Sequence, residues 1–177
     1  NPVNEKFTAF ELGLNFSSND GSLAAKANFY STQWTDRIQT KTVQDQGDSS
    51  DDLIVYLTGI DQAHTGFEVE FAAQLNPMLR LDLGLGYGNW LYTDDAQGSY
   101  RDADTELNYG YALKDLKVGD MPQTNLVLGL SATPMEGLVV STNYRWYDRH
   151  FADWNVSSRE YDASTSDGSS LPDQTWM

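Results

Sequence analysis

Few side chains in this sequence could catalyse a reaction. Cysteine is absent, the two histidines His64 and His150 lie far apart, and neither a G-x-S-x-G nucleophile elbow nor an H-E-x-x-H zinc motif occurs. One grouping could act as a metal or acid–base cluster, because Glu68 and Glu70 share a face of an alternating strand with His64. Carboxylates on a sheet face more often form ion pairs with a neighbouring strand. We therefore predict that the protein is not an enzyme and holds neither a metal nor a cofactor.

Acidic residues gather in two segments that could supply oxygen ligands for calcium. The first set is Asp45, Asp48, Asp51 and Asp52, and the second is Asp94, Asp95, Asp102 and Asp104. Neither set follows the spaced pattern of an EF-hand loop. We therefore expect solvated acidic loops here, not calcium sites.

Aromatic residues in and near the polar segments are the candidates for ligand contact. Phe151, Trp154 and Tyr161 could stack on a sugar or an aromatic chelator, or they could simply pack the last polar segment down. Trp34, near the end of an earlier strand, is a fourth candidate. The sequence leaves both roles open.

Charge and composition exclude several classes of protein. The chain has 177 residues with 26 acidic and 11 basic side chains, a net charge of −15, so it lacks the concentrated basic surface that nucleic acid requires. No run approaches the ~18 apolar residues of a membrane helix, and the length allows one domain or part of one. Residues 1–3 offer neither the basic start nor the apolar core of a secretory leader, so we expect a mature or truncated chain.

Apolar residues recur with a period of two, which is typical of β-strands that have one apolar and one polar face. The clearest segment has Leu79, Leu81, Leu83, Leu85 and Tyr87 on one side, with Arg80, Asp82, Gly84, Gly86 and Gly88 on the other. The pattern predicts six strands, within residues 9–16, 23–30, 67–75, 79–88, 125–132 and 138–146. No long segment shows the helical spacing of apolar residues, so we predict an all-β fold.

The connections between these strands alternate between short and long. Residues 17–22, 76–78 and 134–137 have the Asn, Asp, Gly and Pro content of tight turns. Residues 35–52, 93–120 and 148–177 form polar stretches far longer than the ~2–5 residues of a hairpin loop, and they carry −11 of the net charge of −15. If the strands run up and down, every short turn lies at one end of the sheet and every long acidic loop at the other.

Such a sheet can bury its apolar face against a second sheet in a soluble sandwich, or present it to lipid in a transmembrane barrel. The unequal loop lengths favour the barrel, and the polar face suits a wet lumen. The candidates for lining that lumen are Lys26, Glu68, Glu70, Arg80, Asp82 and Arg145. The alternative is a soluble, secreted β-sandwich module that binds carbohydrate or protein, and a passive porin-like channel is a third reading.

Short sequence words, in a fixed order, resemble those of the TonB-dependent outer-membrane receptors. Residues 1–6 with Phe10-Glu11-Leu12-Gly13 resemble the family's start of a barrel strand, and Asn28-Phe29-Tyr30 with Trp34-Thr35-Asp36-Arg37-Ile38 resembles a strand end. Thr65-Gly66-Phe67-Glu68-Val69-Glu70, Gly119-Asp120-Met121-Pro122-Gln123 and Tyr144-Arg145-Trp146-Tyr147-Asp148 follow in the family's order. Each word is degenerate, but their order extends over nearly the whole chain.

The resemblance implies an antiparallel up-and-down barrel of ~22 strands around a plug, in the outer membrane of a Gram-negative bacterium. Six strands cannot close such a barrel, so residues 1–177 are expected to form one part of it, without plug, TonB box or closing strand. The whole receptor would import a scarce nutrient, such as a ferric siderophore, cobalamin or an oligosaccharide. Its partners would be outer-membrane lipid, its own plug domain, the TonB energy-transducing system and the imported small molecule, and not nucleic acid.

Overall fold

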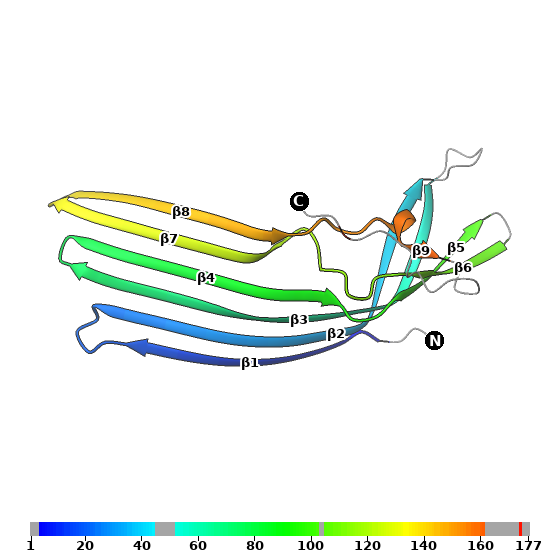
Figure 1. Ribbon diagram of the computed structural model, residues 1–177, viewed down its shortest axis with the longest axis horizontal. Coiled ribbons are helices and arrows are strands. Elements are labelled where there is room, and N and C mark those ends of the chain that lie inside the picture. Colours follow the sequence, from blue (N-terminus) through cyan, green and yellow to red (C-terminus); the bar gives the residue numbers. More distant parts are fainter. Residues whose placement is uncertain (1–3, 45–51, 103–104, 162–173, 175–177) are drawn as a thin grey trace.

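The strands of this chain pair into one curved antiparallel sheet, seen in a computed structural model that describes residues 4–44, 52–102, 105–161 and 174 (Figure 1). They are β1 (Lys6–Ser17), β2 (Leu23–Gln44), β3 (Asp52–Asn76), β4 (Leu79–Tyr92), β5 (Ala96–Asp102), β6 (Thr105–Tyr111), β7 (Pro122–Met135), β8 (Leu138–His150) and β9 (Glu160–Tyr161). A short 3-10 helix, η1 (Val156–Ser158), precedes β9. In the part of the chain that the structure describes, no helix combines the length and the apolarity needed to cross a membrane.

Six long strands lie side by side in the order β1-β2-β3-β4-β7-β8, each antiparallel to the next. This confirms the predicted all-β, up-and-down barrel segment of about six strands. Short turns join β1 to β2, β3 to β4 and β7 to β8 at one end, on the left of Figure 1. The longer connections lie at the opposite end, because successive strands reverse direction. We call these six strands, with β2 taken only up to residue 36 and β3 only from residue 61, the wall.

The register joins the apolar residues of neighbouring strands into rows on one side of the wall. Leu83 of β4 lies opposite Phe71 of β3 and Leu128 of β7. Nearer the long loops, the rings of Phe67 and Tyr87 stack with centroids 5.6 Å apart. We call this side the apolar face; its residues include Phe10, Leu12, Leu14, Phe16, Phe29, Phe67, Val69, Phe71, Leu81, Leu83, Leu85, Tyr87, Leu126, Leu128, Leu130, Tyr144 and Trp146.

No second layer covers the apolar face within the described residues, because all of their strands belong to one sheet. Leu128 and Leu130, in the middle of β7, each remain 40% exposed. A sandwich would enclose these side chains under an opposing sheet. The soluble β-sandwich, which the sequence left open as the alternative, is therefore wrong for this fold.

The carboxylate of Asp20 organises the turn between β1 and β2. Its Oδ1 accepts hydrogen bonds from the Ser18 hydroxyl at 2.6 Å and from the Ser22 backbone N–H at 3.1 Å, and its Oδ2 accepts one from the Ser22 hydroxyl at 2.9 Å. Gly21 adopts a φ of 70°, a left-handed conformation that glycine tolerates without a Cβ clash. The bonds from Ser18, and then those from Ser22, lower the pKa of Asp20 from 3.8 to about 2.

Acid should weaken this turn within a defined pH window. Because the pKa of Asp20 is depressed in the folded state, its stabilising contribution is full above the unfolded value of 3.8, declines below it and is lost below about pH 2. The Asp20→Asn variant lacks this ionisation. Its urea midpoint, measured on the full-length receptor in detergent micelles, should lie slightly below the wild-type midpoint at about pH 6 and meet it near pH 2. A difference that does not change with pH would contradict this role of Asp20.

The long connections are folded, a feature that the alternation pattern did not reveal. Beyond the wall, β2 and β3 continue as a hairpin arm, with pairs running from Arg37 opposite Ile60 to Gln44 opposite Asp52. The β5–β6 hairpin forms within the second long connection, and β5 also pairs with β3 in the arm. The polar stretches therefore build a second, smaller structure at the loop end of the wall.

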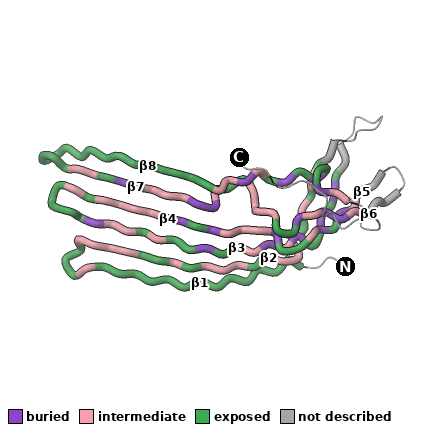
Figure 2. The backbone as a smooth tube through the Cα atoms, viewed as in Figure 1, coloured by how far each residue is buried: buried purple, intermediate pink, exposed green. Residues whose placement is uncertain are grey.

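The main hydrophobic core lies in this structure and not against the wall. We call the whole structure at the loop end the loop cap; it comprises residues 37–44, 52–60, 93–102, 105–121 and 151–161. Its buried core residues are Val55, Leu57, Ile60, Ala96, Tyr111, Leu113, Trp154 and Val156, together with Tyr92 at the end of β4. Figure 2 shows buried segments gathered at this end, whereas most of the wall is intermediate or exposed. The core holds the long connections in fixed positions above the wall.

Candidate functional site

All six charged candidates for lining a lumen lie on the side of the wall opposite the apolar face, which we call the polar face. Lys26, Glu70 and Arg145 fall in one row across the sheet, and Lys26 Nζ lies 3.6 Å from Glu70 Oε2. Arg80 Nη2 lies 2.7 Å from Asp82 Oδ1 along β4. Both ion pairs are exposed, so solvent screens them and they contribute little to stability. Their place in a lumen stays a prediction.

Small residues keep the polar face of β4 open. Gly84 and Gly86 occupy positions where longer side chains would fill the curve of the sheet, and a concavity of about 630 Å³ lies there. Its lining includes Lys26, Glu68, Glu70, Arg80, Asp82 and Asn125. The concavity thus offers both signs of charge beside bare backbone. Such a surface can receive a complementary polar surface of another folded segment.

The structure places His64 against aromatic rings and not in a cluster of carboxylates. Its ring stacks on Trp90 with centroids 5.6 Å apart, and its Nε2 lies 3.3 Å from Gln62 Oε1. The Trp90 indole N–H in turn donates to the Tyr30 hydroxyl at 2.8 Å. Among the residues that the structure describes, no three His, Asp or Glu side chains come together as a metal site would require.

The acidic sets lie partly outside the described residues, since Asp45, Asp48, Asp51 and Asp104 belong to the undescribed segments. Asp95 serves the backbone of the loop cap: its Oδ1 accepts hydrogen bonds from the N–H groups of Leu113 and Lys114, both at 3.0 Å. Its Oδ2 accepts a bond from the Tyr161 hydroxyl at 3.2 Å. Tyr161, a candidate for ligand contact, is thereby tied to the start of β5.

Trp34, the second such candidate, lies at the loop end of the polar face. Its ring meets Phe7 edge to face at 5.9 Å, and the guanidinium carbon of Arg37 lies 3.9 Å from its centroid. Its indole N–H donates to Glu5 Oε2 at 3.1 Å. These neighbours leave the indole half-buried, with one part still open to solvent. Ligand contact by Trp34 stays a prediction.

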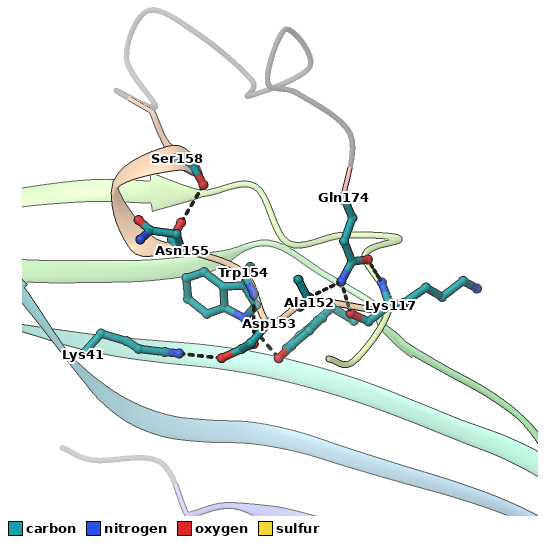
Figure 3. A network of polar contacts seen from close by, with 9 residues as sticks. Lys41, Lys117, Ala152, Asp153, Trp154, Asn155, Ser158 and Gln174 are labelled. Carbon is teal, nitrogen blue, oxygen red and sulfur yellow. Dashed lines mark hydrogen bonds and ion pairs between the residues drawn. The ribbon is translucent and has the colours of Figure 1, made fainter. Parts of the chain in front are cut away.

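Phe151 and Trp154 are buried, with only 7% and 6% of their surfaces exposed. The Trp154 indole N–H donates to the Tyr92 hydroxyl at 3.0 Å. The Lys41 ammonium lies 5.0 Å from the Trp154 ring centroid and forms an ion pair with Asp153 at 2.9 Å (Figure 3). The sequence left open whether these two rings pack the last polar segment or contact a ligand, and the contacts support the packing role.

Gln123 joins the loop cap to the wall, and sequence reasoning missed it. Its buried Oε1 accepts a hydrogen bond from the Trp90 N–H at 3.1 Å. Its Nε2 donates to the carbonyl oxygens of Trp90 at 2.9 Å and Val118 at 3.2 Å. A primary amide has one acceptor and two donor hydrogens, so this side chain takes the place of a strand partner where β7 begins.

A second glutamine acts in the same way from the far end of the chain. Gln174 Oε1 accepts a bond from the Lys117 N–H at 2.6 Å, and its Nε2 donates to the carbonyls of Lys117 at 2.7 Å and Ala152 at 2.9 Å (Figure 3). Lys117 is 57 residues away in sequence. Gln123 ends one of the sequence words that resemble the family, but no spacing or motif marks either glutamine as a link between distant segments.

The Gln123→Leu variant should loosen the junction between the wall and the loop cap. Leucine leaves the Trp90 N–H and the Val118 carbonyl without the partner that Gln123 supplies, at about 1–3 kcal/mol each, whereas the Trp90 carbonyl keeps its bond from the Val118 N–H. We expect faster hydrogen exchange at the amides of Trp90 and Val118 in the full-length receptor in micelles. The Gln123→Glu variant keeps the acceptor for the Trp90 N–H, so its effect should be smaller at that amide. Unchanged exchange in Gln123→Leu would contradict the bridging role.

The sheet has long antiparallel strands, one uncovered apolar face and one polar concave face. Its short turns lie at one end and its structured connections at the other. These features together define a piece of the wall of an outer-membrane β-barrel. The family model described as TonB dependent receptor-like, beta-barrel matches residues 4–175. The chain therefore belongs to the TonB-dependent receptor β-barrel family, as the resemblance implied. Neither the curated proteins nor the solved structures give a significant match. Members of this family are outer-membrane transport proteins and not enzymes.

Proposed function

We propose that this chain, residues 1–177, is one part of the barrel of a TonB-dependent receptor in the bacterial outer membrane, which imports a scarce nutrient. The two-faced wall is the observation that supports this most strongly. Its apolar face contacts the lipid, its polar face lines the lumen, and the loop cap stands at the outer mouth. The wall is thus a structural and electrostatic part of the transporter.

The length of the apolar face supports its contact with lipid. On β4 the apolar positions run from Leu79 to Tyr87, nine residues, before Asn89 interrupts them. A tilted strand needs ~9–11 residues to cross the hydrocarbon core. Toward the loop end lie Phe29, Phe67 and Tyr87, which occupy one row across the sheet. Aromatic rings in that position are typical of the girdle at a membrane interface.

The polar face offers its charges to the receptor's own plug domain. Lys26 with Glu70 and Arg80 with Asp82 form exposed pairs that can exchange partners at little cost in free energy. Glu68 and Arg145 add one charge of each sign to the same face. A plug held by exposed polar contacts can shift when TonB pulls on it, whereas an apolar contact would hold it fixed.

The imported ligand is a small molecule of a kind that requires active uptake, such as a ferric siderophore, cobalamin or an oligosaccharide. At the loop end of the polar face, Trp34 presents a flat ring with Arg37 stacked on it. Such a pair suits an aromatic, anionic or sugar ligand. Tyr161 is the second candidate for contact at the mouth, as part of the loop cap.

Uptake by whole cells tests this function. Cells that produce the full-length receptor should accumulate one radiolabelled ligand from a panel of ferric siderophores, cobalamin and maltooligosaccharides. Accumulation should require both the receptor and an intact TonB system, and cells that lack either one are the matched controls. Equal accumulation in cells without TonB would indicate a passive channel and would contradict the proposal.

A further inference from the structure

Two basic side chains lie together at the loop end of the apolar face. Lys117 pairs with Leu91 in an isolated bridge, and its Nζ donates to Asn89 Oδ1 at 2.6 Å. Leu91 and Asn89 follow Tyr87 in the alternation of β4, so Lys117 lies on the apolar-face side. The guanidinium carbon of Arg149 lies 4.7 Å from the ring centroid of Tyr87. Both cations thus border the row of exposed aromatic rings.

Arg149 reaches this side because its backbone departs from the strand conformation. Strict alternation along β8 would place it on the polar face with Arg145. At φ 55° it adopts the left-handed conformation, which a non-glycine residue rarely does without a local reason. Its Nη1 donates to the carbonyl of Gly88 at 2.7 Å. The unusual backbone therefore accompanies the placement of a cation over the aromatic row.

Within the described residues, no carboxylate forms an ion pair with either cation. Lys6, Lys26, Lys41 and Arg80 each form an ion pair, whereas Lys117 and Arg149 contact a neutral amide oxygen and a neutral carbonyl. Asp148 follows the apolar-face alternation of β8, yet within the described residues it forms no ion pair with either base. Burial first, and then the charge of Arg149, lower the pKa of Lys117, and the charge of Asp115 offsets only part of this. A pair of this kind is best stabilised by a third group that carries negative charge.

The position selects the kind of anion. The pair borders the lipid-facing surface at the level where Asn89 ends the apolar run and aromatic rings mark the membrane interface. Lipid headgroups lie at this depth, and their phosphates are recognised by Arg and Lys through charge-assisted hydrogen bonds. The long loops lie on the external side of an outer-membrane barrel, so the lipid belongs to the outer leaflet.

We infer that Lys117 and Arg149 form a binding site for the phosphate of an anionic lipid headgroup in the outer leaflet, with the acyl chains lying along the apolar face below. This inference rests on the lipid-facing assignment in the proposed function. The site would fix the loop end of the wall at a defined height in the membrane. It uses two of the few basic residues in a chain of net charge −15.

Titration with a phosphorylated lipid and its phosphate-free form tests this site. The full-length receptor in dodecyl maltoside micelles is titrated with bisphosphorylated lipid A or with dephosphorylated lipid A, and native mass spectrometry gives each apparent Kd. The wild type should bind the phosphorylated form more tightly. In the double variant Lys117→Gln/Arg149→Gln, this affinity should fall about twenty-five-fold, because each basic residue near an anionic surface contributes about fivefold.

Controls separate the alternatives. Lys26→Gln/Arg145→Gln removes the same charge from the polar face and should leave lipid affinity unchanged. If the glutamine variant of the site does not fold, Lys117→Arg/Arg149→Lys replaces it in the test; because this variant keeps both charges, it should keep most of the lipid affinity. Equal affinity of wild type and the glutamine variant, or displacement of the lipid by inorganic phosphate alone, would overturn the site. If the apolar face did not contact lipid at all, neither form of lipid A would bind, and the proposed function would fail with it.

Discussion

Arginine in place of Leu83 is expected to weaken assembly of the receptor into membranes by about 2–4 kcal/mol. Leu83 lies in the middle of the apolar run of β4, flanked across the sheet by Phe71 and Leu128. In a barrel, a guanidinium at this position would lie near the midplane of the bilayer, where no water solvates it. Folding of the full-length variant into lipid vesicles, followed by urea titration, measures the loss.

The neighbouring residue provides the matched control. Asp82 lies one position away on the polar face, and its ion pair with Arg80 is exposed and screened by solvent, so it contributes little to stability. The Asp82→Asn variant should therefore assemble almost like the wild type. Equal tolerance of both substitutions would remove the difference between the two faces on which the lipid-facing assignment depends.

The second large effect is expected in the loop cap, where Trp154→Ala should destabilise the packed connections by about 3–5 kcal/mol. The substitution leaves a large cavity beside Tyr92 and removes the ring that lies under Lys41. Hydrogen exchange in the full-length receptor should rise at the amides of Tyr92 and Leu113, which bond within the cap. Amides in the middle of the wall, such as that of Leu83, should not change.

The Trp154→Phe variant tests whether ring packing or the indole hydrogen bond dominates. Phenylalanine keeps most of the buried surface but cannot donate to the Tyr92 hydroxyl, so we expect a loss of about 1–2 kcal/mol. If Trp154→Ala left exchange in the cap at the wild-type rate, the ring would not be part of the core. Trp154 would then be available for ligand contact.

The wall could be predicted from the sequence because apolar and polar residues alternate strictly along each strand. Leu79 to Tyr87 shows this best, since every second residue is apolar and the residues between them are charged or glycine. A period of two is a local property that tertiary structure does not alter. The same regularity predicts that Lys26 and Glu70 lie on one face, and the register pairs them there.

The loop cap could not be predicted because its signals are interrupted. The register of β2 against β3 shifts between Trp34 and Arg37 and again before Gln39, and Asp36 has a φ of 59°. These irregularities break the alternation, so the acidic residues around them resembled a solvated loop. The strands that continue beyond them carry Val55 and Leu57 into a core that forms only when distant segments meet.

The ligand-contact candidates show a further limit of sequence reasoning. An aromatic residue in a polar segment can face a ligand or a small core, and composition does not distinguish the two. Phe151 and Trp154 are buried, whereas Trp34 keeps part of its ring exposed. Lys117 and Arg149 raised no expectation, because their proximity depends on a bridge to Leu91 and a left-handed backbone at Arg149.

Accessibility of single spin labels along β4 tests most directly whether one face of this wall contacts lipid. Labels are attached in the membrane-reconstituted receptor through Leu81→Cys, Leu83→Cys and Leu85→Cys, and through Arg80→Cys, Asp82→Cys and Gly84→Cys. This chain has no cysteine of its own, so each label has one site within it. At the three leucine positions we predict high collision rates with oxygen, which dissolves in lipid. At the other three positions we predict that collisions with a water-soluble nickel chelate become more frequent and collisions with oxygen less frequent. A uniform profile, or one of opposite phase, would contradict the account.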